Sequence, residues 1–295
     1  MKLDVYLKEK RKLVDSFLKH YISSKKKDKD CPKYLSDAMS YALTAGGKRV
    51  RPILCIAGYE AVGGNSDKIM PVATSLELIH TYSLIHDDLP AMDDDDLRRN
   101  QPTTHKVYGE ATAILAGDAL LTDAFNMISQ SSAKPKILIS IISELSRASG
   151  PEGMVGGQTV DIILEGKKAN KKDLHYIHTH KTGALIRASV RIGALMGEAT
   201  PARLNALTSY GEKIGLAFQV VDDILDVTGT KEELGKSAGA DNARGKNTYP
   251  SVFGLDKSQE IAEDLINDSL ESIKRLNHKA EPLAEIARYI LSRRN

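Results

Sequence analysis

The chain has 295 residues with 41 basic and 39 acidic side chains, and the net charge of +2 argues against a chain-wide field for nucleic acid or membranes. A composition that is 41% hydrophobic and 27% charged excludes a disordered chain, and 22 glycines with 10 prolines exclude collagen-like sequence. The two cysteines, Cys31 and Cys55, allow neither a disulfide scaffold nor a four-cysteine metal site. With no apolar leader and no apolar run of about 18 residues, we expect a cytoplasmic protein with reduced thiols.

Apolar residues with helical spacing predict helices along most of the chain. Residues 34–43 place four apolar side chains on one face, and the same period predicts a helix from about residue 66 to residue 86. The isoleucine-rich residues 136–143 are compatible with a strand, but helical neighbours and the absence of turn residues favour a helix.

Capping residues mark where later helices begin and end. Gly197 is expected to end one helix, and Thr200 followed by Pro201 to begin another that runs to about residue 227. No Asn-Gly or Asp-Gly pair lies between alternating runs, so no β-hairpin is predicted. We therefore predict an all-α protein, a single-domain many-helix bundle over residues 1–295 with a central active-site cavity.

Six aspartates lie within residues 87–96, where they repel one another unless water or a cation neutralises them. Pro90 would end the helix just after Asp87 and Asp88, and this break would fold Asp93 back towards Asp87. Carboxylates in this arrangement suit Mg²⁺, which typically joins carboxylates to phosphates. The alternative is a solvated acidic loop.

A second acidic group, Asp222, Asp223 and Asp226, lies within an apolar stretch. Asp222 and Asp226 share one face of the predicted helix. Burying three carboxylates there is unfavourable without a cation, although an exposed stripe of an amphipathic helix is the alternative. Two such groups in one helical chain suggest facing carboxylates that hold Mg²⁺ between them, as the binding of a diphosphate requires.

Cationic side chains accompany both acidic groups. Gly46 and Gly47 let the backbone approach an anion, and Lys48 and Arg51 offer a point charge and a bidentate fork for phosphate. The stretch is not a Walker loop, and its alternative is a helix C-terminus with cationic capping. Five further cations follow the acidic groups or lie between them: Arg98, Arg99, Lys181, Lys236 and Lys246.

Other chemistries find little support in the sequence. His175, His178 and His180 are a weak zinc candidate, because His180 points away from the other two and no HExxH pattern is present. There is no G-x-S-x-G and no apparent cysteine–histidine pairing, so nucleophilic catalysis is not indicated.

Six motifs occur together and in one order: residues 46–52, 87–99, 153–161, 181–182, 218–226 and 236–250. In this order they resemble the trans-isoprenyl diphosphate synthases over about residues 34–295, and the four-residue spacer between Asp88 and Asp93 is most similar to the bacterial farnesyl diphosphate synthases. Three positions depart from the family pattern. Asn100 stands where the family usually has Gly, and Ser237 and Ala240 stand where Pro and Lys are expected.

The resemblance implies an all-α isoprenoid synthase fold and a role for each motif. Three Mg²⁺ per active site, with Mn²⁺ able to substitute, would be bound by Asp87, Asp93 and Asp222. Side chains behind these ligands would be Asp88, Asp223, Asp226, Gln158 and Asp161. The allylic diphosphate would be held by Arg98, Lys181, Thr182, Gln219, Lys236 and Lys246. Isopentenyl diphosphate would be held by Gly47, Lys48, Arg51, His80 and Arg99. The residues expected to be catalytic are Asp87, Asp88, Asp93, Arg98, Lys181, Thr182, Gln219, Asp222 and Lys236.

The implied reaction is a head-to-tail condensation. Departure of pyrophosphate leaves an allylic carbocation near the Thr182 and Gln219 oxygens, the isopentenyl double bond attacks it, and the proton then lost goes to pyrophosphate. Residues 241–249, joined by residues 292–294, are expected to form a loop that orders over the diphosphates and excludes water. The resemblance also implies a homodimer with small diphosphate substrates, no nucleic acid and no stable membrane association.

Product length is expected to depend on Tyr82, which lies about 7.5 Å along the helix axis from Asp87 at 1.5 Å per residue. Unless it is a core aromatic, its ring would form a floor after a C15 chain, whereas Ser83 beside it is too small, so farnesyl diphosphate is the predicted product. The alternatives are geranylgeranyl diphosphate (C20) as product, a class I terpene cyclase, and a helical scaffold with acidic faces.

Overall fold

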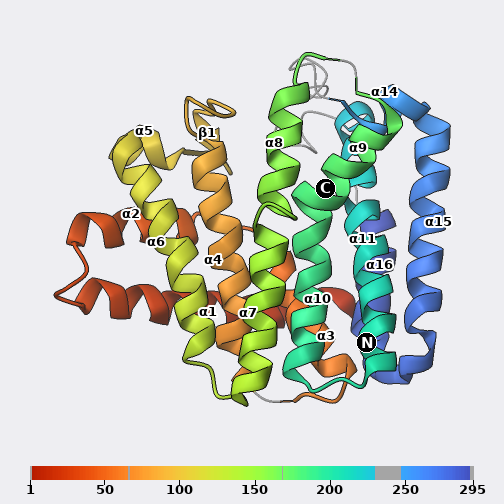
Figure 1. Ribbon diagram of the computed structural model, residues 1–295, viewed down its shortest axis with the longest axis horizontal. Coiled ribbons are helices and arrows are strands. Elements are labelled where there is room, and N and C mark those ends of the chain that lie inside the picture. Colours follow the sequence, from red (N-terminus) through yellow and green to blue (C-terminus); the bar gives the residue numbers. More distant parts are fainter. Residues whose placement is uncertain (1, 66, 168, 230–246, 293–295) are drawn as a thin grey trace. The chain divides into compact units, whose positions relative to one another are not determined.

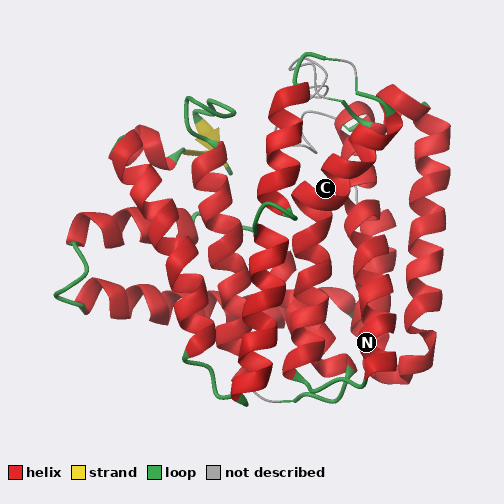
Figure 2. Cartoon of the chain, in the orientation of Figure 1, coloured by secondary structure: helices red, strands yellow, loops and turns green. Residues whose placement is uncertain are grey.

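The computed structural model describes residues 2–65, 67–167, 169–229 and 247–292. Apart from one two-stranded hairpin, the regular structure in these ranges is helical, as Figures 1 and 2 show. The chain divides into two compact units. We call residues 2–56 with 66–142 the N-terminal unit, and residues 57–65 with 143–295 the C-terminal unit. The expectation of one domain over residues 1–295 stays a prediction.

The N-terminal unit is built around α4. Its elements are α1 (Leu3–Lys27), α2 (Lys33–Thr44), the first part of α3 (Val50–Ala61), the 3₁₀ turn η1 (Asp67–Ile69), α4 (Met70–Asp87), β1 (Leu97–Arg98), β2 (Gln101–Pro102), α5 (Thr104–Tyr108), α6 (Glu110–Ser129) and the first part of α7 (Pro135–Ser149). Helix α4 packs along α6 and is buried on most of its sides, with Leu76 and Ile79 fully inside. The helix predicted over residues 66–86 is thus confirmed, with η1 as its first turn.

A buried ion pair fixes the loop that precedes α3. Arg49 has a left-handed φ of 53°, and its Nη1 donates to Glu77 Oε1 at 2.6 Å while its Nε donates to Asp15 Oδ1 at 2.9 Å. Its Nη2 donates to the Leu43 carbonyl at 2.7 Å. Arg49 therefore joins α1, α2 and α4, and its guanidinium serves the fold rather than a ligand.

We expect Glu77→Gln to lower the free energy of unfolding by about 2 kcal/mol, because a neutral amide is a weaker partner for the buried Arg49 guanidinium. Denaturation in urea measures the change. Asp264→Asn is the matched control, because Asp264 lies exposed on the last long helix of the chain. A loss no larger than that of the control would contradict the role given to the ion pair.

The hairpin β1–β2 differs from the prediction that no hairpin forms. Leu97 lies opposite Pro102 and Arg98 opposite Gln101. Arg99 and Asn100 connect the strands with φ of 55° and 62°, and a two-residue type I′ turn requires positive φ at both positions. Asparagine tolerates this conformation better than most residues, which explains how Asn100 replaces the family's usual glycine.

The C-terminal unit packs around α11. Beside the ends of α3 and α7 it contains α8 (Met154–Leu164), α9 (Lys171–Ile177), the π-helical turn η2 (His178–Gly183), α10 (Ala184–Met196), α11 (Pro201–Thr228), α14 (Tyr249–Phe253), α15 (Leu255–Ile273), the 3₁₀ helix η3 (Lys274–Ala280) and α16 (Glu281–Ser292). Helix α11 packs against both α10 and α15 (Figure 1). The fully buried Tyr210 of α11 donates its hydroxyl to the Leu283 carbonyl of α16 at 2.6 Å.

The predicted helix ends are confirmed in this part of the chain. The Thr200 hydroxyl accepts the Arg203 N–H and caps α11, with Pro201 at its first position. Gly197 follows the last residue of α10. Residues 136–143 lie within α7, so the helical reading of this isoleucine-rich stretch is correct.

Candidate active site

The first acidic group lies where α4 ends. The helix stops at Asp87, and after Pro90 the chain turns back until the Asp93 N–H donates to the Asp87 carbonyl at 2.8 Å. Asp94, with a φ of 48°, completes the turn. The structure thus brings Asp87 and Asp93 together as the proline predicts, and both side chains are half-buried.

Asp88 faces into the N-terminal unit instead. It is 2% exposed, and its Oδ1 accepts Arg98 Nε at 2.6 Å and Arg98 Nη2 at 2.5 Å. The same Nη2 lies 3.5 Å from Asp95 Oδ2. Burial raises the pKa of the Asp88 carboxyl, and the Arg98 guanidinium opposes that rise. Arg98 is therefore anchored to the acidic loop, and its contact with a diphosphate stays a prediction.

Cations of the predicted isopentenyl diphosphate site lie together in the N-terminal unit. The Arg99 guanidinium rests on the loop backbone: its Nη1 donates to the Gly46 carbonyl, and a Cβ at Gly47 (φ 126°) would lie 2.7 Å from the same nitrogen. Arg51 Nε is buried and has no hydrogen-bond partner within the described ranges. Burial, and then the charges of Arg51 and Arg99, hold the pKa of His80 well below its ordinary value, so the imidazole is neutral at pH 7.

This cationic cluster has an excess of positive charge. Burial also lowers the pKa of Arg51 and of Arg99, yet both guanidiniums stay charged at neutral pH. Glu77, the carboxylate that favours their charge, is already bonded to Arg49. Positive charges held close together repel one another, and an anion with several oxygens relieves that repulsion, so the cluster suits a diphosphate. Lys48 lies exposed on the same loop.

The second acidic group lies on α11 and faces two ways. Asp222 is exposed, whereas Asp223 and Asp226 are 4% and 8% exposed. Asp222 is therefore the member of the group that solvent reaches, and the other two carboxylates are buried.

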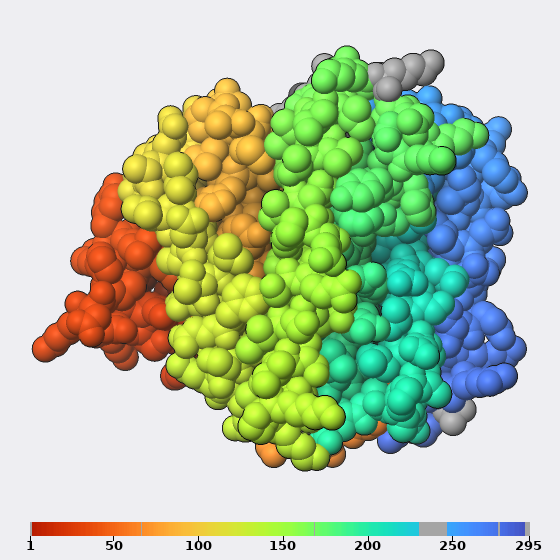
Figure 3. Space-filling model, viewed as in Figure 1, coloured from red at the N-terminus to blue at the C-terminus, as the bar shows by residue number. Residues whose placement is uncertain are grey.

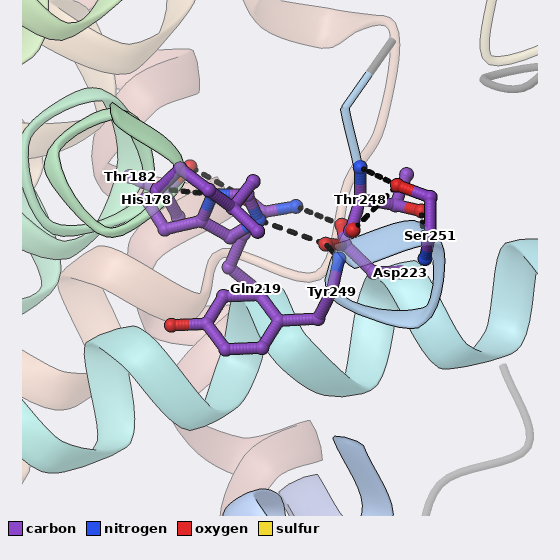
Figure 4. Close-up of polar contacts among 8 residues, drawn as sticks. His178, Thr182, Gln219, Asp223, Thr248, Tyr249 and Ser251 are labelled. Carbon is purple, nitrogen blue, oxygen red and sulfur yellow. Dashed lines mark hydrogen bonds and ion pairs between the residues drawn. The ribbon is translucent and has the colours of Figure 1, made fainter. Parts of the chain in front are cut away.

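Asp223 accepts three hydrogen bonds, from donors on η2, α11 and α14, as drawn in Figure 4. Its Oδ2 accepts His178 Nε2 and the Tyr249 N–H, both at 2.8 Å, and its Oδ1 accepts Gln219 Nε2 at 3.1 Å. The Thr182 hydroxyl donates to Gln219 Oε1 at 2.9 Å. The structure thus brings Thr182 and Gln219 together, as their shared predicted role requires.

Lys181 and Thr182 are presented by η2, a π-helical turn of a kind that often marks functional sites. Lys181 Nζ donates to Asp161 Oδ2 of α8 at 2.5 Å. A Cβ at Gly157 would lie 2.2 Å from the Lys181 backbone nitrogen, so glycine lets α8 pack directly on η2. Gln158 lies buried beside it on α8.

His178 is the functional candidate that sequence reasoning missed. The sequence pattern groups it only with His175 and His180 as a weak zinc candidate, whereas its ring bonds to Asp223, 45 residues away in the chain. His180 instead stacks on Tyr176 with ring centroids 3.8 Å apart. The H-T-H-K-T spacing carries no sign of this partner.

The acidic side chains suit Mg²⁺ whose shell is completed by phosphate and water, rather than a metal ion held by protein ligands alone. Among the residues that the structure describes, no three histidine, cysteine or acidic side chains gather to hold a metal. Mg²⁺ needs only one or two carboxylates when phosphates and water complete its shell. Asp87 and Asp93 in one unit and Asp222 in the other suit that role. The predicted sharing of Mg²⁺ by the two acidic groups stays a prediction.

Several predicted residues lie outside the described ranges. These are Lys236, Ser237, Ala240, Lys246, the part of the 241–249 loop before residue 247, and Arg293 with Arg294.

A family model described as polyprenyl synthetase matches residues 32–286. The chain belongs to the polyprenyl synthetase family. A chloroplastic geranylgeranyl pyrophosphate synthase of Capsicum annuum is 46% identical over 295 residues, which cover 99% of this chain and 79% of that protein. The solved FPP/GFPP synthase of Zymomonas mobilis has a TM-score of 0.86 at 34% identity, with 97% and 99% of the two chains covered. The geranylgeranyl pyrophosphate synthetase of Pyrococcus horikoshii Ot3 has a TM-score of 0.89 at 31% identity, covering 99% and 98%.

Membership in the polyprenyl synthetase family confirms the trans-isoprenyl diphosphate synthase resemblance and the all-α isoprenoid synthase fold. The chain is an enzyme of the prenyltransferase type, and polyprenyl synthetases generally depend on Mg²⁺.

Proposed function

We propose that this polyprenyl synthetase condenses isopentenyl diphosphate with an allylic diphosphate and that its product is geranylgeranyl diphosphate (C20). The observation that supports the condensation is the partly buried cationic cluster of Arg51, Arg99 and neutral His80, which suits a second anion besides the one expected at Lys181. A class I terpene cyclase binds one diphosphate and has no use for a second site. Curated relatives named as geranylgeranyl synthases, at 45% to 49% identity, support the C20 product.

The residues divide the work as follows. Asp87, Asp93 and Asp222 would hold Mg²⁺, which when bound neutralises diphosphate charge and stabilises the leaving pyrophosphate. Lys181 binds the allylic diphosphate, while Arg51 with its neighbours binds isopentenyl diphosphate. The allylic C–O bond breaks and its electrons leave with pyrophosphate. The isopentenyl π electrons form the new C–C bond, and the lost proton passes to pyrophosphate.

Farnesyl diphosphate, the product predicted from Tyr82, is the second candidate. Tyr82 is 6% exposed, and its ring lies edge-on to His86 with centroids 5.8 Å apart. His86 in turn bonds to the Ile114 carbonyl of α6 at 3.0 Å. These contacts suit a core aromatic between α4 and α6 as well as a floor.

Product chain length by chromatography decides between the two candidates. We expect the wild type to make C20, and Tyr82→Ala to keep C20 while lowering the unfolding free energy by about 3 kcal/mol through loss of a buried ring. Ser83→Ala is the control and should change neither the product length nor the free energy of unfolding. A wild type that stops at C15, with Tyr82→Ala extending the product to C20, would overturn the C20 proposal in favour of farnesyl diphosphate.

We further propose a homodimer that buries the outer face of α6. Ile114 and Leu115 are 43% and 58% exposed there, and α6 lies at the surface of the N-terminal unit, coloured yellow in Figure 3. Residues 110–129 are also long and apolar enough to span a membrane, and about a third of this stretch is buried in the protein, but helices of soluble proteins have the same length and composition. We expect light scattering to give twice the chain mass, and Leu115→Glu to halve it; a monomeric wild type would contradict the dimer.

A further inference from the structure

His178 is buried in the C-terminal unit with an acceptor at each ring nitrogen. Its Nε2 lies 2.8 Å from Asp223 Oδ2 and its Nδ1 lies 2.9 Å from the Leu174 carbonyl oxygen. The side chains of His178 and Asp223 are each 5% exposed. The Leu174 carbonyl and the Asp223 carboxylate hold the ring from both sides and fix its orientation.

From this pair a chain of hydrogen bonds runs to the predicted reaction centre. With its Oδ2 held by His178 and by the Tyr249 N–H, Asp223 turns its Oδ1 to Gln219. The amide NH₂ of Gln219 then faces Asp223, so its oxygen must face Thr182, whose hydroxyl donates to it at 2.9 Å. Figure 4 shows these hydrogen bonds from the His178 imidazole to Thr182.

The fixed direction of these bonds has a chemical consequence. A free Gln amide presents oxygen or NH₂ with little preference, and an NH₂ group aimed at an allylic cation would repel it. Because Asp223 accepts only, the Gln219 oxygen and the Thr182 lone pairs keep one orientation. Without His178, Asp223 would lose one of the two donors that hold its Oδ2.

We propose that His178 is a positioning residue that orients Gln219 and Thr182 through Asp223. This inference rests on the proposed prenyl transfer and adds to it a residue that touches neither substrate. It also explains why Asp223, next to the exposed Asp222, is turned inwards: its oxygens accept from protein donors.

Two variants separate the nitrogens of His178. Gln places an amide nitrogen near the position of Nε2 and keeps the bond to Asp223, whereas Asn reaches only the position of Nδ1. We expect His178→Asn to lower kcat about 30-fold with the KM for isopentenyl diphosphate unchanged within about 2-fold, and His178→Gln to stay within about 3-fold of the wild type. His175→Asn is the control, because His175 lies exposed on α9.

A double-mutant cycle measures whether the loss of kcat in His178→Asn depends on Thr182. In the Thr182→Val background, His178→Asn is expected to cost little further activity, because the group it orients is already gone. The Mg²⁺ concentration for half-maximal rate should be unchanged in His178→Asn, since no metal ligand is touched. Should His178→Asn fail to fold, Gln219→Glu turns a second carboxylate oxygen to Asp223 and is expected to lower kcat similarly.

The outcomes are distinguishable. Equal kcat in His178→Asn and His178→Gln, an effect on the KM for isopentenyl diphosphate instead of kcat, or full additivity with Thr182→Val would each overturn the positioning role while leaving the proposed function intact. An unchanged kcat in Gln219→Glu would do the same. A wild type that forms no prenyl diphosphate would overturn the proposed function and the inference together.

Discussion

Asp222→Ala is expected to lower kcat by about 10³-fold or more in a protein that stays folded, because it removes a carboxylate placed to hold the charge that stabilises leaving pyrophosphate. Asp222 is exposed on α11, so its removal leaves no cavity, and alanine favours the helix. Removing one of three neighbouring carboxylates also relieves their repulsion. Asp87→Ala is expected to act in the same way from the end of α4.

Steady-state kinetics with saturating Mg²⁺ and a thermal melt measure this prediction. Asp264→Ala, an exposed aspartate on α15, is the control and should leave kcat unchanged. Near-normal turnover of well-folded Asp222→Ala would contradict the requirement for both acidic groups, even with Asp87→Ala inactive.

Arg51→Ala is expected to raise the KM for isopentenyl diphosphate by about 10²-fold, since it removes a half-buried guanidinium that can pair with phosphate. Lys181→Ala is expected to act on the allylic diphosphate and on kcat instead, because Lys181 lies on η2 beside Thr182 and donates to Asp161 of α8. Varying each substrate in turn separates the two effects.

The exposed Lys172 of α9 gives the matched control, and Lys172→Ala should change neither constant. If Arg51→Ala and Lys181→Ala weaken the same substrate, the division into two diphosphate sites is wrong.

Local sequence was enough to predict the helices and the shape of the acidic loop. Proline at 90 both ends α4 and turns the chain, and the resulting Asp93-to-Asp87 bond spans only six residues. Thr200, Pro201 and Gly197 likewise mark helix ends with residues whose capping chemistry is local. Such features depend on neighbours in the chain and not on packing.

Features that depend on distant partners could not be read from the sequence. Arg49 and Arg51 look alike in the glycine-rich motif, yet Arg49 is bonded to Glu77 and Asp15, whereas the buried Nε of Arg51 has no partner among the residues that the structure describes. The contact of Arg99 with Gly46 spans 53 residues and that of His178 with Asp223 spans 45. The left-handed Arg99-Asn100 turn was missed because neither residue is a glycine.

The most direct test mixes the purified chain with Mg²⁺, labelled isopentenyl diphosphate and geranyl diphosphate, and follows pyrophosphate release and label in the extracted product. We predict one pyrophosphate for each new C–C bond, label in a longer prenyl diphosphate, and loss of both signals when a chelator removes Mg²⁺. A folded protein that releases no pyrophosphate and transfers no label under these conditions would contradict the assignment as a prenyl diphosphate synthase.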